Sequence, residues 1–267
     1  MTTIDPTARV DKNAAIGKNV TIGPYCIIGP KFTIGDDCRL VGHVVIEGRT
    51  NIGARTVISP FASLGSPPQS VHYRGEDTAL VVGSDCVIRE SVTMNIATAG
   101  GKGVTKIGDH CFFMAYSHVG HDSVVGNHVV FANCVPLGGF VEVGDYAFLG
   151  GMSAVHQFTR VGAYAMIGAS TIVTQDVVPF AYAVGSPVGL AGINKIGLTR
   201  GGFSSKSIHK IRDAYRAIFA GAGTLAERVE MVALKHANDE FAMRMIDFIR
   251  AGKSRHLATP RGDKGAL

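Results

Sequence analysis

The sequence has no long apolar run, no secretory signal and no paired cysteine motif. A membrane-spanning helix needs about 18–20 successive apolar residues, so we expect no transmembrane segment. The first ten residues, MTTIDPTARV, lack the basic and apolar regions of a secretory signal. Together these absences predict a soluble, cytoplasmic protein.

The cysteines are few and odd in number, and no CxxC occurs. The five are Cys26, Cys38, Cys86, Cys111 and Cys134. An odd count without that motif argues against a disulfide framework and against a redox pair. We therefore expect buried, reduced thiols.

Glycine is abundant, with 34 residues, and follows a regular pattern. A large aliphatic residue recurs every six positions from Ile4 to Leu64, at Val82 and Ile88, and from Ile107 to Val173. Glycine often follows it directly, and a small residue usually lies four positions on. A period of six matches neither the 3.6 of an α-helix nor the 2 of a half-buried strand.

This hexapeptide pattern predicts a short strand and a corner in every six residues. Three such sides close a triangular coil of 18 residues, and stacked coils pair their strands in parallel. The aliphatic and small residues then point inward, and glycine and its neighbour form the corner, where positive φ is often needed. The fold class is therefore a parallel β-helix, which known hexapeptide-repeat proteins imply to be left-handed.

The repeat is interrupted near residues 66–79 and 95–106, which we interpret as loops ejected from the coils. It stops at Val178-Pro179, and helical patterns follow, including a capping box at Thr224–Glu227. The expected domains are a β-helix over 1–188 and a C-terminal helical domain over 189–267. The helices should cover the last coil, and residues after Arg255 should fray.

Charge is unevenly distributed between these two parts. Residues 1–188 carry a net charge of −2, whereas residues 189–267 carry +7. The basic excess is either a solvated helical surface or a docking surface for an acidic partner or phosphates. Nucleic acid is not among the expected partners.

An 18-residue coil brings several polar residues to one edge of the prism. His121 should lie under Gly139, and Gly139 under Gln157, with His118 and His156 nearby. The segment Ser117–Asp122, SHVGHD, combines two imidazoles with a carboxylate.

Three interpretations of these histidines compete. Corner histidines are often solvated surface residues, which we favour for His110 and His128. A metal site, as in hexapeptide-fold carbonic anhydrases, fits poorly because the HxxH gap is two residues rather than four. The third interpretation is general base catalysis, since an imidazole beside an orienting carboxylate suits removal of a hydroxyl proton; the family resemblance described below favours it. We therefore expect no metal.

Four segments give the chain a more specific resemblance. They are IRESVT at 88–93, the segment His118–Asp122, GGMSAVHQF at 150–158, and GFS at 202–204. With these segments the chain resembles the UDP-N-acetylglucosamine O-acyltransferases, the first enzymes of lipid A synthesis, over nearly its whole length. The repeat alone would not separate this family from other acyltransferases.

The resemblance implies a reaction and a set of roles. His121 would take the proton of the sugar 3-hydroxyl, Asp122 would orient or polarise His121, and the Gly139 N–H would stabilise the oxyanion. The remaining implied roles are sugar binding by Gln69, His72 and Tyr73, substrate positioning by His118, His156 and Gln157, nucleotide and phosphate binding by Asn194 and Arg200, and an acyl-chain end at Met166 and Ala169.

The resemblance also implies partners. The donor is a 3-hydroxyacyl chain on the 4′-phosphopantetheine of acyl carrier protein, so the chain itself would need no cofactor. The family forms homotrimers with active sites between subunits, and its basic C-terminal region receives the acidic carrier protein.

The chain departs from the family pattern at several positions. Residues 70–72 are Ser-Val-His where members often have Asp-Leu-Lys, and Phe140 replaces a common His. Ile196 and Gly201 replace a Glu and an Arg of the nucleotide site. Ala169 is small, which implies a medium-to-long acyl chain. The acceptor atom, O of UDP-N-acetylglucosamine or N of its 3-amino analogue, stays open.

Two other functions are weighed against this one. The N-acyltransferase of the same pathway carries an extra N-terminal uridine-binding domain, whereas the repeat here begins at Ile4. A trimeric carbonic anhydrase would contain bound zinc.

Overall fold

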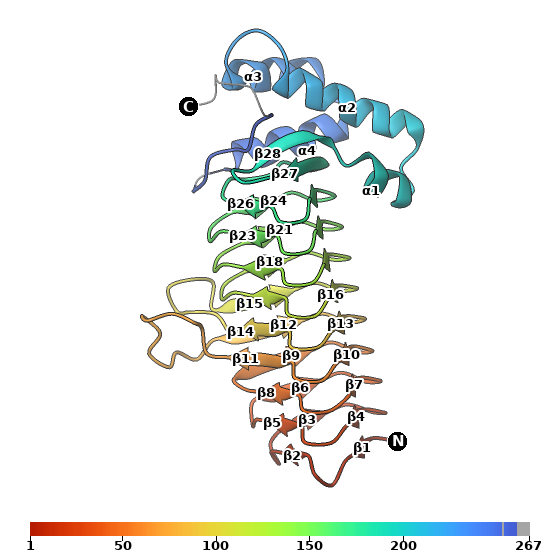
Figure 1. The fold of residues 1–267 in the computed structure, drawn as a ribbon, viewed down its shortest axis with the longest axis vertical. Helices are drawn as coiled ribbons and strands as arrows, with labels where there is room; N and C mark the ends of the chain where they lie inside the picture. Colours follow the sequence, from red (N-terminus) through yellow and green to blue (C-terminus); the bar gives the residue numbers. More distant parts are fainter. Residues whose placement is uncertain (253, 261–267) are drawn as a thin grey trace.

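The computed structural model describes residues 1–252 and 254–260. Most of this part of the chain is a long triangular prism of stacked coils with helices at its C-terminal end (Figure 1). Three sheets form the faces of the prism, and from β1 to β26 the chain visits them in the order A, B, C. The parallel β-helix and the C-terminal helical region predicted from the sequence are confirmed.

The strands are mostly two residues long. Sheet A contains β1 (Thr3–Ile4), β4 (Thr21–Ile22), β7 (Arg39–Leu40), β10 (Val57–Ile58), β13 (Val87–Ile88), β16 (Phe112–Phe113), β19 (Val130–Phe131), β22 (Phe148–Leu149), β25 (Met166–Ile167), β27 (Ala181–Val184) and β28 (Gly189–Ile193). Sheet B contains β2 (Arg9–Val10), β5 (Ile27–Ile28), β8 (Val45–Ile46), β11 (Ser63–Ser66), β14 (Thr93–Asn95), β17 (His118–Val119), β20 (Pro136–Leu137), β23 (Ala154–Val155) and β26 (Ile172–Val173). Sheet C contains β3 (Ala15–Ile16), β6 (Phe32–Ile34), β9 (Arg49–Ile52), β12 (Ala79–Val82), β15 (Val104–Ile107), β18 (Val124–Val125), β21 (Glu142–Val143) and β24 (Arg160–Val161).

The aliphatic residue of each hexad ends a strand and points into the prism. Ile58, for example, is fully buried and aligned with Leu40 below and Ile88 above. Four cysteines occupy the small inward position and are buried, as expected. Cys134 is exposed, so the expectation of burial is wrong for that thiol, which lies at a corner instead.

Two different residues shape each corner. The glycine after the hexad residue has ordinary φ and is needed because coils stack closely: a Cβ added to Gly108 would lie 2.6 Å from the backbone carbon of Gly126. Positive φ falls instead on a later, usually non-glycine residue, such as Asp122 and Phe140, each at φ 60°. The prediction that the corner glycines supply positive φ is therefore wrong for these positions.

Side chains at successive corners stack on one another. Between sheets C and A, the rings of His110 and His128 are parallel, with centroids 4.6 Å apart, and Tyr146 and Tyr164 continue the column. His110 and His128 are exposed but are not merely solvated residues, because flat rings at one coil spacing stack favourably.

Both ejected loops leave the prism at the edge between sheets B and C (Figure 1). The first loop spans residues 67–78 between β11 and β12, and the second spans residues 96–103 between β14 and β15. The predicted limits 66–79 and 95–106 are too wide. The reason is that Ala79–Val82 pairs with Val104–Ile107, which extends both strands of sheet C into the expected loops.

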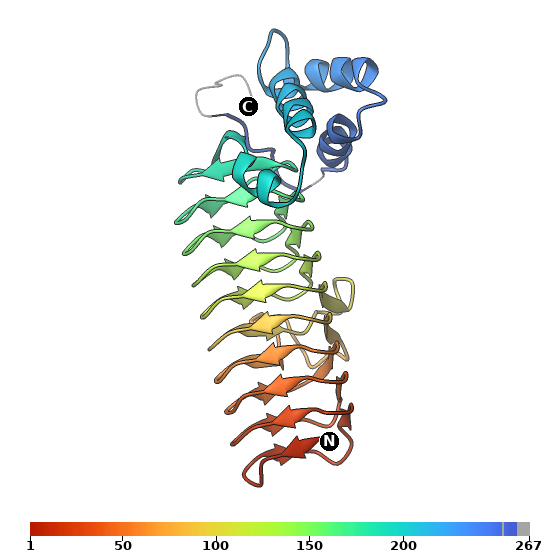
Figure 2. The ribbon, with the colours of Figure 1, turned by 90° about the vertical axis from the view of Figure 1, so that its right-hand side faces the viewer.

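Four helices cover the last coil (Figures 1 and 2): α1 (Lys195–Arg200), α2 (Ser205–Phe219), α3 (Leu225–Lys235) and α4 (Glu240–Arg250). The capping box at Thr224 and Glu227 is present at the start of α3. Below the helices, β28 runs antiparallel to β27, unlike every other strand pair of the described chain. Phe180 of the last coil contacts the rings of Phe203 and Phe241, which joins the helices to the prism.

The expectation that residues after Arg255 fray is wrong for residues 256–260. Asp176 N donates to His256 O at 2.8 Å and Ala258 N donates to Asp176 O at 2.8 Å, and Ala258 is fully buried. Residues 261–267 lie outside the described residues. The proposed division of the chain at residues 188 and 189 falls between β27 and β28, and it stays a prediction.

We predict that Ile58→Ala lowers the free energy of unfolding by about 2–5 kcal/mol, because the truncation leaves a cavity between two rigid coils. Leu234→Ala is the control, since Leu234 is 84% exposed on α3 and should change stability by about 0.5 kcal/mol or less. Denaturant unfolding of both variants measures the difference. Equal losses would contradict the inward role of the hexad residues.

Candidate functional site

A groove of about 460 Å³ runs along the edge between sheets B and C, directly above the two loops. Its lining includes Gln69, His118, His121, Gly139, His156 and Gln157. The column predicted from the 18-residue coil is present. Phe140 N donates to His121 O at 2.9 Å and Phe158 N donates to Gly139 O at 3.1 Å, which stacks the three corners.

His121 and Asp122 form a hydrogen-bonded pair at the first of these corners. His121 Nδ1 lies 2.9 Å from Asp122 Oδ2, and the Asp122 side chain is completely buried. A carboxylate only accepts hydrogen bonds, so Nδ1 carries the proton and Nε2 has a free lone pair. Among the described residues, Nε2 forms no hydrogen bond, which leaves it able to accept a proton.

The second ejected loop holds Asp122 in place. Thr98 donates to Asp122 Oδ2 from both its N–H, at 3.0 Å, and its hydroxyl, at 2.7 Å. On the backbone side, Asp122 N donates to Thr105 Oγ1 at 2.9 Å. Gly101 lies so close to Asp122 Oδ1 that a Cβ would collide with it. The loop therefore covers the carboxylate, excludes water and fixes its orientation.

Gly139 lies against the face of the His121 ring. A Cβ on Gly139 would lie 2.7 Å from Cε1 and 2.8 Å from Nε2 of that imidazole. At the equivalent corners of another edge, Asp109 N and Asn127 N donate to side chains of the next coil. The Gly139 N–H forms no such bond to any described residue, so it is available beside the His121 imidazole.

His118 lies on β17 and is largely buried. Its Nδ1 is 2.7 Å from Thr93 Oγ1 of the coil below. Burial lowers the pKa of His118 below its ordinary value of 6.5; a hydrogen bond with the Thr93 backbone opposes this shift and nearby His121 adds to it. His118 is therefore neutral at physiological pH.

His156 and Gln157 form the upper part of the groove, and both are exposed. They are joined by Arg255, whose guanidinium contacts His156 Nδ1 at 2.8 Å and Gln157 O at 3.1 Å. Below them, the first loop contributes Gln69 to the groove lining. His72 of that loop is exposed, and Tyr73 is half-buried with its hydroxyl donating to Glu76 O at 3.3 Å.

Asp122, His72 and Tyr73 do not line this groove, and four other predicted residues also lie outside it. Asn194 caps α1: its Oδ1 accepts from Gly197 N at 3.0 Å and its Nδ2 donates to Tyr164 O at 3.0 Å. Arg200 ends α1 and is exposed. Met166 lies on β25 of sheet A, and Ala169 is exposed at the following corner.

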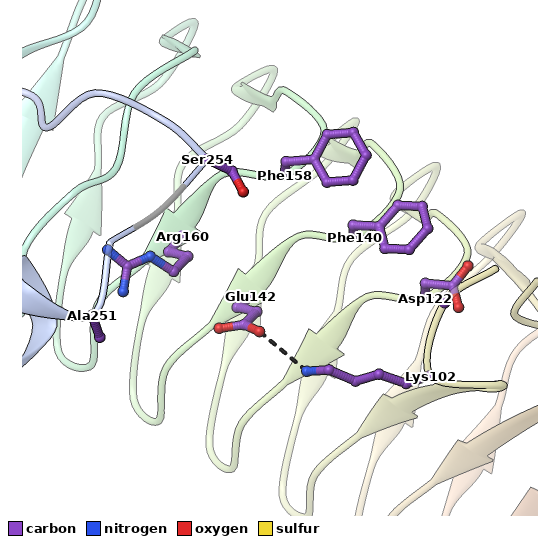
Figure 3. Close-up of a pocket in the computed structure, with 9 residues that line it drawn as sticks. Lys102, Asp122, Phe140, Glu142, Phe158, Arg160, Ala251 and Ser254 are labelled. Carbon is purple, nitrogen blue, oxygen red and sulfur yellow. Dashed lines mark hydrogen bonds and ion pairs between the residues drawn. The ribbon is translucent and has the colours of Figure 1, made fainter.

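A second cavity of about 390 Å³ lies on the sheet C side of the same edge (Figure 3). Phe140 and Phe158 project one above the other, with ring centroids 4.8 Å apart, and Lys102 pairs with Glu142 across the sheet. Phe140 also meets the His121 ring edge-to-face at 5.4 Å. Phe140 therefore packs against the His121 imidazole with an apolar ring.

Comparison with known proteins decides the family. A profile described as bacterial transferase hexapeptide (six repeats) matches residues 13–48 and 105–139, and one described as UDP N-acetylglucosamine O-acyltransferase, domain 2, matches residues 176–258. Over 257 residues the chain is 55% identical to the acyl-[acyl-carrier-protein]–UDP-N-acetylglucosamine O-acyltransferase of Azorhizobium caulinodans, covering 96% of this chain and 95% of the relative. The chain belongs to the UDP-N-acetylglucosamine O-acyltransferase family.

Solved structures of this family have the same fold. The UDP-N-acetylglucosamine acyltransferase of Bacteroides fragilis has a TM-score of 0.92 at 33% identity, covering 96% of this chain and 99% of that one. The enzyme of Francisella novicida has a TM-score of 0.93 at 32% identity, with coverage of 97% and 95%. The family resemblance inferred from the sequence is confirmed.

Sequence reasoning missed three residues that support the site. Thr93 was visible only as part of a family segment, and its contact with His118 crosses a coil that contains a loop. Thr98 lies in that loop, where no periodicity locates it. Arg255 is far from His156 in sequence, and no repeat connects them. Of the three, only Thr93 could have been placed from the sequence. If the residues of the second loop are left out of the count, Thr93 falls one coil below His118.

None of the described helices is long and apolar enough to cross a bilayer. Within residues 1–252 and 254–260, no three His, Cys, Asp or Glu side chains come together to hold a metal ion.

We predict that Thr98→Val lowers the acyl-transfer rate about tenfold, because the variant loses a charge-assisted hydrogen bond worth about 1.5 kcal/mol. The backbone N–H bond to Asp122 remains, so the protein should still fold. Thr98→Ser keeps the hydroxyl and is the matched control. If valine and serine at position 98 give the same rate as threonine, the loop does not position Asp122.

The lowered pKa of His118 predicts a pH dependence of stability. As pH falls below about 6.5, the unfolded chain binds a proton at this position before the folded protein does, so the fold loses stability. His118→Gln removes the titrating group. Melting temperatures measured against pH should therefore fall less steeply for the variant in this range, and parallel curves for the two proteins would contradict the assignment.

Proposed function

We propose that this chain transfers a 3-hydroxyacyl group from acyl carrier protein to the 3-hydroxyl of UDP-N-acetylglucosamine, the first step of lipid A biosynthesis. The relatives at high identity carry the name of this activity. The observation that supports the chemistry is the His121–Asp122 pair, whose Nε2 lies beside the N–H of Gly139, with no described residue bonded to either group. The names of these relatives favour the O-acyltransferase over the N-acyltransferase and carbonic anhydrase alternatives.

In the proposed reaction, Nε2 of His121 removes the proton of the sugar hydroxyl while Asp122 stabilises the resulting imidazolium. The sugar oxygen forms a bond to the thioester carbon, and the negative charge moves to the former carbonyl oxygen. The Gly139 N–H stabilises that oxyanion. When the carbonyl re-forms, the carbon–sulfur bond breaks and the proton on His121 passes to the thiolate of the pantetheine.

Substrate positioning follows the polar residues of the groove. His118 is neutral and can exchange hydrogen bonds with a sugar hydroxyl, and Gln69, His156 and Gln157 offer further polar groups at the same edge. His72 and Tyr73 of the first loop would complete the sugar site. Because residues 70–72 depart from the usual Asp-Leu-Lys, an assay should include both the hydroxyl acceptor and its 3-amino analogue.

The other predicted residues fit a site shared between subunits. The outward positions of sheet A are apolar over several successive coils: Val57, Val87, Phe112, Val130, Phe148 and Met166. Contiguous apolar surface of this kind favours association, and a homotrimer would cover it with further copies of the chain. Asn194, Arg200, Met166 and Ala169 would then reach the groove of a neighbouring copy, with the forked guanidinium of Arg200 suited to phosphate.

Acyl carrier protein is the proposed partner of the helical region. This part of the chain carries the +7 charge, and Lys206 and Lys210 are exposed on α2. A basic surface attracts an acidic protein and speeds its association. The proposal also places the protein in the cytoplasm and requires no cofactor beyond the pantetheine of the donor.

We predict that His121→Ala lowers the rate of acyl transfer about 10²–10⁴-fold, because the general base is lost. His110→Ala is the matched control: His110 is exposed at a different edge, so its loss should leave the rate unchanged. The assay crosses UDP-N-acetylglucosamine and its 3-amino analogue with carrier proteins that bear different 3-hydroxyacyl chains. Unchanged transfer by the folded His121 variant would refute the mechanism.

A further inference from the structure

The segment from Ser254 to Pro260 returns from α4 to the prism and is fixed there by backbone hydrogen bonds. Asp176 exchanges two such bonds with this segment, one with His256 and one with Ala258. Further on, Leu190 N donates to Thr259 O at 3.0 Å. Arg255 immediately precedes these anchors, so its backbone is held at the upper end of the groove.

The Arg255 side chain determines how His156 can be protonated. A guanidinium has only donors, so at 2.8 Å it must donate to a lone pair on His156 Nδ1. A proton on Nδ1 could instead be donated to Gln157 O at 3.2 Å, but that nitrogen cannot do both. Arg255 Nε occupies Gln157 O as well, at 3.1 Å. The neutral ring must therefore carry its proton on Nε2.

We infer that Arg255 is a positioning residue that fixes His156 as an Nε2–H donor toward the groove. No hydrogen bond joins Nε2 of His156 to any residue that the structure describes, so the proton is available to an acceptor oxygen of the substrate. The expected effect on kinetics rests on the proposed function, whereas the tautomer of His156 does not depend on it. The planar fork of Arg255 is suited to this task, because it reaches the imidazole and the carbonyl together.

The same contact joins the helical region to the groove. Arg160, at the foot of this region, donates to Phe248 O at 3.0 Å from its Nη2 and to Asp176 Oδ2 at 2.8 Å from its Nε. Asp176 in turn holds the segment that carries Arg255. The orientation of His156 thus depends on how α4 and the residues after it are seated on the last coils.

The test measures the tautomer directly, by ¹⁵N NMR of histidine-labelled protein with His156 assigned from the His156→Gln spectrum. We expect the Nε2–H tautomer in the unaltered chain. In Arg255→Ala, Nδ1 loses its donor and can donate to Gln157 O, so the Nδ1–H form should appear. Arg255→Lys should give an intermediate result, since an ammonium can reach one of the two acceptors. Arg250→Ala, which breaks only an exposed pair with Glu230, should leave the tautomer unchanged.

Steady-state kinetics then test the role of the tautomer. We expect Arg255→Ala to raise KM for the UDP-sugar about three- to tenfold with little change in kcat, which is the loss of one binding hydrogen bond. An Nδ1–H tautomer in the unaltered chain, or an unchanged tautomer in Arg255→Ala, would overturn the inference. If the unaltered chain transfers no acyl group, the proposed function fails, yet the NMR result still decides the role of Arg255.

Discussion

The close spacing of successive coils is the constraint on which the rest of the site depends. Parallel strands lie about 4.8 Å apart, and the corners must approach equally closely. At the edge between sheets B and C this leaves His121 directly beneath a residue of the next coil, and only glycine fits there. The absence of a side chain on Gly139 gives the imidazole its space and leaves a backbone amide beside it. The architecture thus supplies both groups before any substrate is bound.

The sequence predicted the parts of the structure that the repeat controls. Inward burial of Ile58, the column of His121, Gly139 and Gln157, and the covering helices all follow from counting sixes and recognising amphipathic segments. Periodicity gives the position of a residue within its coil. The same count therefore predicts which residues stack on one another in coils that are far apart in the sequence.

The sequence failed where the repeat carries no information. Thr98 lies in an ejected loop, so nothing in its spacing indicates that it binds Asp122. Arg255 meets His156 only because a segment after the last helix folds back, and the pattern there indicated fraying. The corner glycines were expected because of positive φ, whereas the structure requires glycine there because neighbouring coils lie too close together for a Cβ. In each case the missing information is a contact between segments that no period relates.

Both loops leave the prism at one edge, so they lie apart from the residues that pack its interior. Neither loop interrupts the inward column of aliphatic residues, because Ile58 still stacks on Ile88 and Ile88 on Phe113 across the inserted residues. Loop length and composition can therefore vary between relatives without altering the packing that keeps the prism rigid. Residues 67–78 can therefore change in length or composition while the corner that carries His121, two coils above them, keeps its place in the stack.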